Sequence, residues 1–597
     1  DLLAIFIVIV LFVPNSSVVL ANPGIGATAY IYWILVAVTF LLPSAIVAGQ
    51  LNRLIAADGA IYVWTHRALG PLWGFLAGFC AWVPGILVLL TAADYILTLM
   101  QAIGIQVAGS NANWLAAPWQ EGILALGVLL FAGWLSAFST RFIMRLTKYI
   151  VVCYGVGIFM VGLAGIIWLF QGHTPRSPLT FGHLELGGQN IVLYGVIVLA
   201  LLGIEVPLNM AAETRRPDAS RLFLRWGPLI VLAAYLFGTF GVMIVVPAQN
   251  AGTLYSTLTA VGIVFGTPVA VLVAINFISF FLIVAVIYNI SFARILFVSA
   301  LDHRLPPAFA RVNRRAAPYY AATTQIVIVS IIAIFTYIVG PLLYPWAGPD
   351  FSSDVYNVSQ AITSVIWCVS MVILFLDLPV ILYRYREFFA KRRDQLIAPL
   401  WILNLCCFMG GIASLLGIWT TLSTSWDVKL IPNDQWAVYV GTSTLVTLIL
   451  GFVGSAYPRL LSSLNEQIAA TQENARLYNE LRIAYAKLSE ADQLKDAFLT
   501  TASHELRTPL TIVQGYLELL ADMDADINPH IRRTFLNKAR RACDELVLLQ
   551  TNIMDASRIE FDRASLNCTR LRLKNVCTSM VELFEPLILQ ELSLIHI

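Results

Sequence analysis

An apolar run over residues 190–211 is interrupted at its centre by Leu202-Gly203-Ile204-Glu205-Val206-Pro207. Glycine weakens a helix and proline removes a backbone donor, so the stretch predicts a helix that unwinds midway. An earlier apolar run, over residues 2–20, contains Val13-Pro14-Asn15-Ser16-Ser17. Broken spans at corresponding places in the chain point to a transporter with inverted repeats. Proline and glycine also make packing kinks in membrane helices, so the breaks alone leave both interpretations open.

The composition excludes a purely soluble protein. Of the 597 residues, 59% are hydrophobic and 12% are charged, and the mean hydropathy is +0.78. Soluble domains are about 45–50% apolar and about 25% charged. Of the 35 acidic residues, 16 precede Leu460 and 19 follow it. The sequence therefore predicts a membrane domain over residues 1–456, joined near Tyr457–Arg459 to a polar part.

Twelve apolar runs are long enough to cross a bilayer, which takes about 20 residues. Lys and Arg are concentrated in alternate loops, with eighteen on one side and only Arg176 and Lys429 on the other. Because positive loops stay in the cytoplasm, this bias predicts that both termini are cytoplasmic. The predicted spans are 2–20, 30–50, 69–100, 120–138, 146–170, 190–211, 227–247, 264–299, 319–341, 357–384, 399–424 and 436–456.

Several separated motifs occur in a fixed order along this part. They are Asp58-Gly59-Ala60-Ile61-Tyr62-Val63-Trp64, then Gly203-Ile204-Glu205, then Ala293-Arg294 with Ala300-Leu301-Asp302. The order resembles the amino acid–polyamine–organocation (APC) permeases, with the glutamate/GABA-antiporter-like branch nearest. The resemblance implies an all-α, LeuT-like bundle of five-plus-five inverted repeats and two further spans. It also implies an amino-acid-like substrate at the unwound segments, near Ser16, Ser17, Gly203, Ile204 and Glu205.

Charged residues inside spans are candidates for function because their burial in lipid is costly. Glu205, at the break of the sixth span, is the strongest candidate for the substrate site or gate. Asp94 and Asp377 are weaker candidates. A hydrogen bond between helices is the alternative for Asp94, and an ion pair with Arg384 or Arg386 is the alternative for Asp377. The cysteines and histidines show no metal-ligand spacing, so we expect no metal site.

The polar part carries two heptad patterns. Each has a 4-3-4-3-4-3 spacing, which is typical of a helical seam that packs against another helix. Asn528 and Pro529 between them have the features of a helix start. Two seamed helices joined by a turn form a hairpin, and two hairpins can form a four-helix bundle, so we expect a homodimer. The seams are Leu477, Leu481, Ala484, Leu488, Ala491, Lys495 and Phe498, and then Phe535, Ala539, Ala542, Leu546, Leu549, Ile553 and Ala556.

One string on the first of these helices carries chemistry: Phe498-Leu499-Thr500-Thr501-Ala502-Ser503-His504-Glu505-Leu506-Arg507-Thr508-Pro509-Leu510. It closely resembles the H-box of the histidine-kinase dimerisation and phosphoacceptor (HisKA) domain. The resemblance implies that His504 accepts a phosphoryl group from ATP, bound with Mg²⁺, and that Glu505 orients or deprotonates the ring. Thr508, one helical turn away, would align water for dephosphorylation of a response regulator. Pro509 is expected to kink the helix.

These patterns predict four parts in the chain: the membrane domain, a cytoplasmic signalling coiled coil over 457–497, a phosphoacceptor domain over 498–565, and the start of an ATP-binding domain over 566–597. We expect the last to be cut short, because Arg570–Leu589 resembles only its first strand and helix and no Gly-x-Gly pattern follows. The chain as given would then be inactive alone. Its apolar start without Met indicates a truncated N-terminus rather than a signal peptide.

Together, the motifs indicate a multi-pass sensor histidine kinase of a bacterial inner membrane, with a permease-like input domain that senses or transports amino acids. Its expected partners are a second copy, a response regulator receiver domain, an amino acid or related small molecule and the lipid bilayer, without direct contact to nucleic acid. One alternative is an amino acid transporter whose kinase tail is regulatory or vestigial. Another is that the permease part only anchors and dimerises the kinase.

Overall fold

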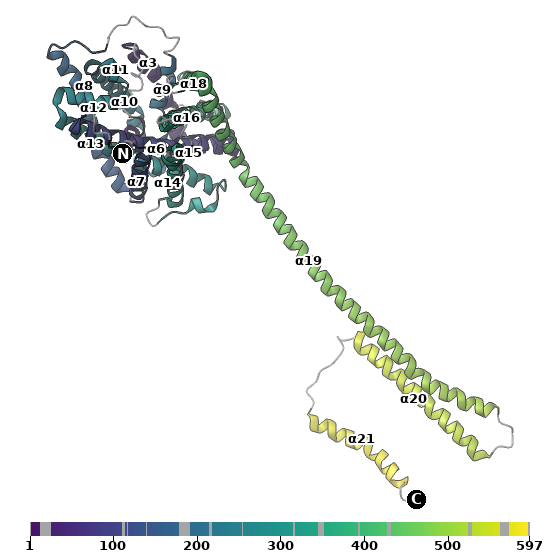
Figure 1. The fold of residues 1–597 in the computed structure, drawn as a ribbon. Coiled ribbons are helices and arrows are strands. Elements are labelled where there is room, and N and C mark those ends of the chain that lie inside the picture. The colour runs from purple at the N-terminus through teal and green to yellow at the C-terminus, as the bar shows by residue number, and fades with distance from the viewer. Residues whose placement is uncertain are drawn as a thin grey trace. The chain divides into compact units, whose positions relative to one another are not determined.

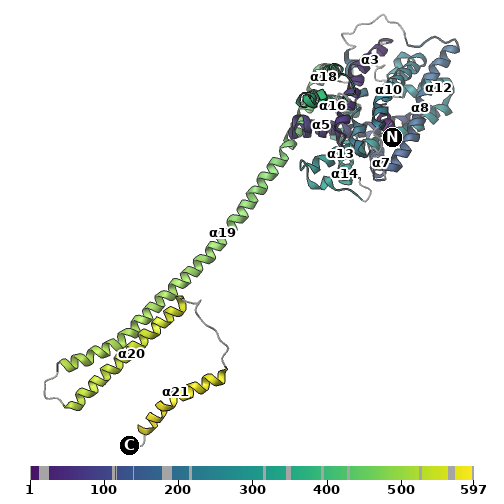
Figure 2. The same cartoon turned by 180° about the vertical axis from the view of Figure 1, so that it is seen from behind.

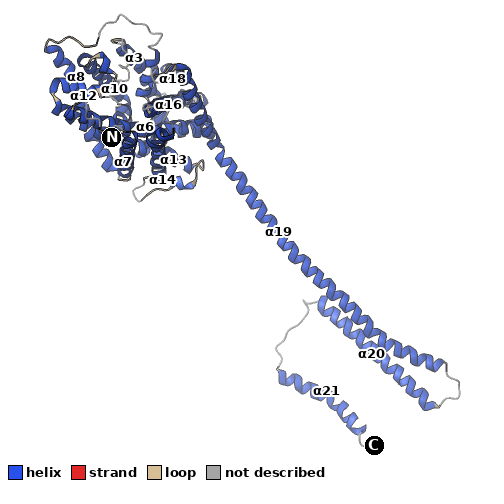
Figure 3. Ribbon diagram, in the orientation of Figure 1, coloured by secondary structure: helices blue, strands red, loops and turns tan. Residues whose placement is uncertain are grey.

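The computed structural model contains only helices among the residues that it describes (Figures 1 and 3). These residues are 2–11, 26–109, 114–115, 117–138, 140–177, 191–213, 218–253, 255–313, 317–343, 351–391, 395–426, 431–522, 528–561 and 572–594. They divide into two compact units, Asp1–Leu464 and Asn465–Ile597. In lipid a helix satisfies its own backbone hydrogen bonds, which explains why the apolar runs of the first unit take this form.

Eleven described helices are long and apolar enough to cross a membrane. Each matches one of the predicted spans from the second to the twelfth, within five residues at either end, except that the predicted span 69–100 ends eight residues before the helix does at Ala108. The predicted first span is described only over Leu2–Leu11, where α1 (Leu2–Val10) lies. The eleven are Thr28–Leu54, Pro71–Ala108, Pro118–Ser136, Arg141–Phe170, Leu193–Met210, Phe223–Val245, Thr267–Leu301, Tyr319–Leu343, Val355–Arg384, Leu400–Ser423 and Asn433–Tyr457.

The helices of the membrane unit that matter below have the following bounds. The second span is α3 (Thr28–Val36), η1 (Ala37–Leu41) and α4 (Leu42–Leu54), and α5 (Ala60–Leu69) precedes α6 (Pro71–Ala108), α7 (Pro118–Ser136) and α8 (Thr140–Phe170). The middle of the unit is α9 (Val192–Leu201), η3 (Val206–Glu213), α10 (Asp218–Val245), α11 (Ala248–Ala251), α12 (Ser256–Phe265) and α13 (Thr267–Leu301). The remainder is η4 (Pro307–Ala310), α14 (Tyr319–Ile334), η5 (Phe335–Val339), α15 (Gly340–Leu343), α16 (Phe351–Arg384), α17 (Arg386–Lys391) and α18 (Leu400–Ser423).

Small residues let these helices approach closely. A Cβ atom on Gly241 of α10 would collide with the backbone carbonyl of Val161 on α8. Such contacts are typical of membrane helices, which associate by packing rather than by a hydrophobic driving force. The tightly packed core of this unit includes Phe40, Tyr154, Phe280 and Trp367, all of which are buried.

The second unit contains a helical hairpin. The helix α19 (Asn433–Ala521) contains the twelfth span and, at its end, the first arm of the hairpin, and α20 (Pro529–Phe561) is the second arm. The two arms lie side by side in both views (Figures 1 and 2). A separate helix, α21 (Leu573–Leu594), follows. A strand followed by a helix was expected over Arg570–Leu589. The described residues of that range are helical from Leu573 onward and contain no strand, and residues 570 and 571 lie outside the described residues.

Candidate functional sites

The end of α1 forms one wall of the candidate membrane site. The last carbonyls of a helix have no partner within the helix. Here three consecutive carbonyls are satisfied by tyrosines from three other helices. The hydroxyl of Tyr288 on α13 donates to the Ile9 carbonyl at 3.0 Å, Tyr235 on α10 donates to Val10 at 2.9 Å, and Tyr154 on α8 donates to Leu11 at 3.1 Å. The backbone of the first span therefore leaves its helix at a point that three helices fix.

The sixth span breaks where its sequence predicted. The helix α9 ends at Leu201, the backbone passes through Leu202 and Gly203, and the turn at Ile204 and Glu205 leads into η3. Gly203 has φ +108°, which residues with a side chain rarely adopt. A Cβ atom there would also lie 2.6 Å from Ile9 Cγ2. The break of the sixth span and the end of α1 are therefore in contact, and only glycine fits between them.

Glu205 places a carboxylate inside this contact. Its side chain is 1% exposed, and Oε1 accepts a hydrogen bond from Trp367 Nε1 of α16 at 2.6 Å. Oε2 has no hydrogen-bond partner among the described residues. The rings of Tyr288 and Phe292 stand edge-on to Trp367, with centroids at 6.5 Å and 6.0 Å. Glu205 therefore lies at a cluster of buried aromatic rings, called here the aromatic enclosure, and one of its carboxylate oxygens has no hydrogen-bond partner among the described residues.

The structure thus brings three of the five predicted substrate-site residues together: Gly203, Ile204 and Glu205. Ser16 and Ser17 lie outside the described residues. The sequence did not identify Trp367 or the three tyrosines. Their only signal is that buried Trp N–H and Tyr O–H groups usually find a hydrogen-bond partner. That signal does not say which partner, and Trp367 is 162 positions from Glu205.

The two weaker acidic candidates have other partners. Asp94 Oδ1 accepts a hydrogen bond from the Tyr337 hydroxyl at 2.8 Å, which agrees with the alternative of a bond between helices. The alternative for Asp377 is wrong: its Oδ2 accepts from Thr65 Oγ1 at 2.6 Å, and no described arginine pairs with it. Arg384 is two turns further along α16, about 10 Å away, and donates instead to the Arg67 carbonyl.

The separated motifs of the membrane domain are in contact with one another in the structure. Asp58 forms an ion pair with Arg294 at 3.1 Å, and His66 Nδ1 lies 3.3 Å from Asp302 Oδ2. The Gly59 amide donates to the Asn209 carbonyl at 3.1 Å. Burial, with a contribution from the Asp302 carboxylate, raises the pKa of the Tyr62 hydroxyl above its usual range. These contacts join α5 and the residues just before it to α13, to the residue that follows α13, and to η3.

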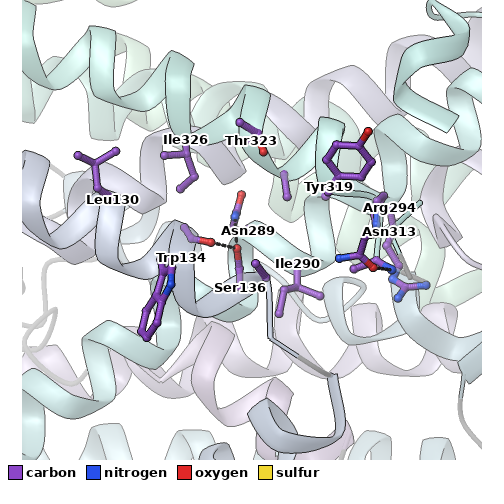
Figure 4. Close-up of a pocket in the computed structure, with 16 residues that line it drawn as sticks. Leu130, Trp134, Ser136, Asn289, Ile290, Arg294, Asn313, Tyr319, Thr323 and Ile326 are labelled. Carbon is purple, nitrogen blue, oxygen red and sulfur yellow. Dashed lines mark hydrogen bonds between the residues drawn. The ribbon is translucent and has the colours of Figure 1, made fainter. Parts of the chain in front are cut away.

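A separate cavity of about 230 Å³ lies between α7, α13 and α14 (Figure 4). Asn289 donates to the Ser136 hydroxyl at 2.8 Å across it, and Leu130, Trp134 and Ile326 form apolar walls. Arg294, the partner of Asp58, also lines it. Gly203, Ile204 and Glu205, the predicted substrate-site residues that the structure describes, do not line this cavity, so it is distinct from the enclosure around Glu205.

The second candidate site lies on the hairpin. His504, Glu505 and Thr508 are all exposed on α19. Thr508 Oγ1 donates to the His504 carbonyl at 3.3 Å, which places the threonine one turn from the histidine on the same side of the helix. Helical structure continues through Pro509, although the proline supplies no donor to the Glu505 carbonyl. The imidazole and the adjacent carboxylate are therefore open to an approaching protein domain.

The two arms of the hairpin cover each other along one side. On α20, Ala539 and Ala542 of the predicted seam are buried, and Phe535 contacts Tyr516 of α19 with ring centroids at 5.5 Å. The other sides of the hairpin leave large apolar side chains uncovered: Phe498, Leu499, Leu510, Ile512, Leu517, Leu519, Leu536, Val547, Leu548 and Met554. An isolated hairpin exposes these residues to water. Among them only Phe498 belongs to a predicted seam. The first predicted seam is exposed throughout, whereas the second is buried or half-buried from Phe535 to Ile553.

Two known protein families match separate parts of the chain. The family model for amino acid permeases matches residues 2–452. The chain belongs to the amino acid permease family. A second model, the His Kinase A (phospho-acceptor) domain, matches residues 494–561 and so includes the whole predicted H-box. The chain thus combines a membrane domain of the permease family with a histidine-kinase phosphoacceptor domain, and both resemblances noted in its sequence are confirmed.

Some similar proteins match the membrane domain, and others match the phosphoacceptor part. The "uncharacterized transporter lpg1691" of Legionella pneumophila is 25% identical over 327 residues, which cover 52% of this chain and 67% of the relative. "Probable histidine kinase 5" of Oryza sativa is 29% identical over 26% of this chain, but the match spans only 12% of that kinase. The structure of MhsT in complex with L-phenylalanine has a TM-score of 0.52 at 16% identity, covering 70% of this chain and 98% of that one. This similarity confirms the predicted LeuT-like fold.

Proposed function

We propose that the protein is a membrane sensor histidine kinase of a two-component system, whose permease domain binds an amino acid or related amine as input. The observation that carries the proposal is the intact H-box on the exposed face of a hairpin, in one chain with a permease domain. The loop charges favour cytoplasmic termini, and the two-component chemistry favours a bacterial inner membrane. Homodimerisation would cover the apolar side chains that one hairpin leaves exposed.

The proposed reaction is phosphoryl transfer to His504. A ring nitrogen attacks the γ-phosphorus of ATP, the N–P bond forms, and the bond to the ADP oxygen breaks. Glu505 accepts or orients the ring proton, and an imidazole that titrates near neutrality suits this exchange. Mg²⁺ with ATP, held by the ATP-binding domain of the kinase, would supply the phosphoryl group and neutralise its charge. The phosphoryl group then passes to an aspartate of a response regulator, which returns His504 to its free form. Thr508 would align the water that later hydrolyses the aspartyl phosphate and releases inorganic phosphate.

The proposed input site is the enclosure at the two broken spans. An ammonium group near Glu205 Oε2 would give the unpartnered oxygen a charge-assisted hydrogen bond. Unwound backbone at Gly203 and Ile204, and the predicted Ser16 and Ser17, would supply further polar contacts. Trp367, Tyr288 and Phe292 would pack around the apolar part of the ligand. This combination fits a small amine or amino acid better than it fits an anion.

Signal transfer would use two access states of the permease domain. A ligand shifts such an equilibrium only by its differential affinity for the two states. A difference of about 1.4 kcal/mol changes the ratio tenfold. The helix α19 contains both the last span and His504, so a shift that reaches the span is a shift in the kinase helix itself.

A second candidate is an amino acid transporter in which the kinase tail is regulatory or vestigial. The observation in its favour is that the permease model matches almost the entire membrane domain. The two functions can coexist in one chain. A third candidate, a permease part that serves only as anchor and dimer platform, would be supported if Glu205→Gln left the response to ligand unchanged.

One experiment separates these candidates. The chain, with the catalytic domain supplied in the same reaction, is reconstituted in proteoliposomes, and amino acid uptake and labelling of His504 are measured in parallel. The sensor proposal expects labelling that changes with the amino acid and disappears in His504→Ala. Uptake without ligand-dependent labelling would rule the sensor out and leave the transporter. Labelling should fail with ATP alone if this chain lacks its own catalytic domain.

A further inference from the structure

We propose that a groove between α16 and α18 binds an anionic phospholipid of the cytoplasmic leaflet. One acyl chain would lie in the groove, and the phosphate would bind the arginines at its mouth. The inference goes beyond the proposed function, since it concerns neither the aromatic enclosure nor the hairpin. It uses the orientation that the loop charges favour, in which α16 ends and α18 begins at the cytoplasmic surface.

The groove has a buried floor. The helices α16 and α18 pack side by side (Figures 1 and 2), and a groove of about 590 Å³ lies between them. Phe375 and Leu382 of α16 and Cys407 of α18 form its floor, and all three are buried. Pockets that bind small molecules have volumes of about 300–1,000 Å³. The groove is therefore large enough to hold a bound molecule.

The two rims of the groove are each formed by one face of a helix. Leu376 and Tyr383 are exposed and lie seven positions apart on α16, whereas Leu400 and Phe408 are exposed and lie eight positions apart on α18. Such spacings place residues on the same face of a helix. At about 1.5 Å per residue, eight positions extend about 12 Å, most of the roughly 15 Å depth of hydrocarbon in one leaflet. The length of the groove therefore suits an acyl chain.

Asn404 adds a polar group to the groove. It is exposed on α18, four positions after Leu400 and therefore about 6 Å from the start of the helix. Its side-chain amide forms no hydrogen bond with another described residue. An amide that faces hydrocarbon without a partner is costly. In a glycerophospholipid the ester carbonyls lie between the phosphate and the acyl chains, so one of them would accept a hydrogen bond from Asn404.

Three arginines lie at the cytoplasmic mouth of the groove. Arg384 and Arg386 follow the rim residue Tyr383 by one and three positions, and both are exposed. Arg384 Nη1 donates to the carbonyl of the exposed Arg67 at 3.0 Å, which brings the end of α5 beside the end of α16. None of the three arginines forms an ion pair with a described acid. Their guanidinium groups therefore keep N–H donors for a phosphate, which arginine can bind with two parallel hydrogen bonds.

The sequence at this mouth is strongly basic. Residues 384–393 contain five Lys or Arg and one acid, Glu387. Clusters of about four to eight basic residues on the cytoplasmic side of a span are typical of sites for anionic lipids. The helix α18 also begins here, and its N-cap Pro399 provides no side-chain hydrogen bond. The positive end of the helix dipole therefore adds to the attraction that the arginines exert on a phosphate.

An anionic lipid explains this combination better than a soluble anion or a zwitterionic lipid does. A soluble anion such as phosphate would bind the arginines and leave the groove and Asn404 without a partner. A zwitterionic lipid would fill the groove, but it would bring a cation of its own to the arginines. A molecule with an anionic head and an alkyl chain complements both parts of the site.

Lipid titrations of the purified full chain test the charged mouth. Native mass spectrometry measures the dissociation constant of the first lipid retained, for phosphatidylglycerol and for phosphatidylethanolamine. Arg384→Gln combined with Arg386→Gln removes two positive charges at the mouth. The matched control is Arg141→Gln with Arg145→Gln, because these two are also exposed arginines at the cytoplasmic end of a span, on α8.

A second pair of variants tests the groove. Leu376→Trp places a larger side chain over the groove from a rim position that is 53% exposed, so the fold should tolerate it. Leu445→Trp is the matched control, at a leucine of the twelfth span that is 58% exposed and does not line the groove. Calorimetric titration with inorganic phosphate measures binding of a soluble anion to the same preparation.

We expect the unaltered chain to bind phosphatidylglycerol at least about fivefold more tightly than phosphatidylethanolamine. The paired arginine variant should weaken phosphatidylglycerol binding about tenfold or more, and its control should weaken it less than about twofold. Leu376→Trp should weaken binding of both lipids at least about fivefold, whereas Leu445→Trp should leave it unchanged.

Three results would overturn the inference. The first is an equal loss of phosphatidylglycerol binding in the arginine variant and its control, which would indicate attraction to the general positive charge of the loops. The second is unchanged lipid binding in Leu376→Trp. The third is binding of inorganic phosphate as tight as that of phosphatidylglycerol, which would assign the arginines to a soluble anion. Because mouth and groove are altered separately, a folding defect in one variant does not decide the outcome.

Discussion

The two candidate sites differ in burial and in the number of helices that form them. Glu205 is a buried carboxylate that accepts a hydrogen bond from Trp367 of α16, and Tyr288 and Phe292 of α13 pack on that tryptophan. His504 is an exposed imidazole on one helix, and its neighbours Glu505 and Thr508 come from the same turn or the next. The first site must open before a ligand can enter. The second site is already exposed, and in the proposed function it reacts only when an ATP-binding domain docks on the helix.

The difference shows how input and output can be separated within one chain. A buried, nearly closed site binds through differential affinity between two packings, so its effect is a change in conformation. An exposed phosphoacceptor needs only access and orientation, so its local structure can stay the same in both states. Substitutions at the two sites should therefore fail in different assays, and the following predictions test that separation.

His504→Ala should cause the largest effect, complete loss of labelling from ATP by a supplied catalytic domain, because no other ring nitrogen stands beside Glu505. Amino acid binding to the membrane domain should be retained. Phosphoramidate-specific labelling and a ligand-binding assay on the same preparation measure both. His530→Ala, another exposed histidine of the hairpin, is the control and should keep labelling. Loss of ligand binding in His504→Ala would contradict the separation.

Gly203→Ala should destabilise the membrane domain by about 2–4 kcal/mol, from a backbone in a region unfavourable to alanine and a collision with Ile9. Thermal unfolding in detergent gives the size of the loss, and ligand binding should fall with it. The matched control is Gly155→Ala on α8, where an added Cβ meets no atom within 4 Å. Equal unfolding temperatures for the two variants would show that the break tolerates a side chain at position 203, which contradicts the prediction.

Glu205→Gln should weaken binding of an amine or amino acid by about tenfold or more, since a charge-assisted hydrogen bond contributes about 1.5–3 kcal/mol. Calorimetric or scintillation-proximity binding measures the change. Asp377→Asn is the matched control, because that acid is also buried but bonds to Thr65 away from the break. If both substitutions change affinity alike, the enclosure around Glu205 is not the binding site.

Trp367→Phe should cost about 1–3 kcal/mol of stability, because it leaves Glu205 Oε1 without its donor in a buried setting. The cost should shrink when Glu205→Gln is combined with it, and a double-mutant cycle on the unfolding free energy measures that coupling. Trp401→Phe, at a side chain that is 67% exposed on α18, is expected to have little effect. Additive losses in the cycle would refute the bond as a stabilising contact.

Thr508→Ala should have the smallest effect on stability, because its bond to the His504 carbonyl is on the helix surface. It should slow dephosphorylation of the response regulator more than it slows labelling of His504. Thr511→Ala provides the control, since Thr511 makes the same kind of bond to the Arg507 carbonyl at 2.8 Å. Parallel slowing of both reactions would assign Thr508 a structural role.

The spans and the hairpin were predictable because each follows from a short-range pattern. Hydropathy over about 20 residues locates a span, and a 4-3 spacing locates a seam. The break at Gly203 was predictable for the same reason, since glycine and proline act on their own backbone. The H-box was predictable because its residues lie within one helix. Membership of the permease family and the presence of a phosphoacceptor domain are confirmed, whereas the roles of the individual site residues stay predictions.

The surroundings of Glu205 could not be predicted, because they depend on how distant helices pack. Tyr235 is 225 positions from the carbonyl of Val10 that it contacts, and Tyr288 is 279 positions from that of Ile9. No local period carries such information. The wrong partner for Asp377 has the same origin: nearby arginines were considered, and Thr65, 312 positions away, is the residue that α5 brings into contact.

The three tyrosines at the end of α1 have a consequence for observing the molecule. Each hydroxyl donates to a different, consecutive carbonyl, and Tyr235 also lies within hydrogen-bond distance of the Ala200 carbonyl at 3.3 Å. Isotope labels on Ile9, Val10 and Leu11 would therefore give three vibrational frequencies, one for each of α13, α10 and α8. If one of these helices moves away from α1, its tyrosine loses the hydrogen bond, and only the vibrational band of the carbonyl that it contacts shifts. The end of α1 thus offers three spectroscopic probes, one for the position of each of three other helices.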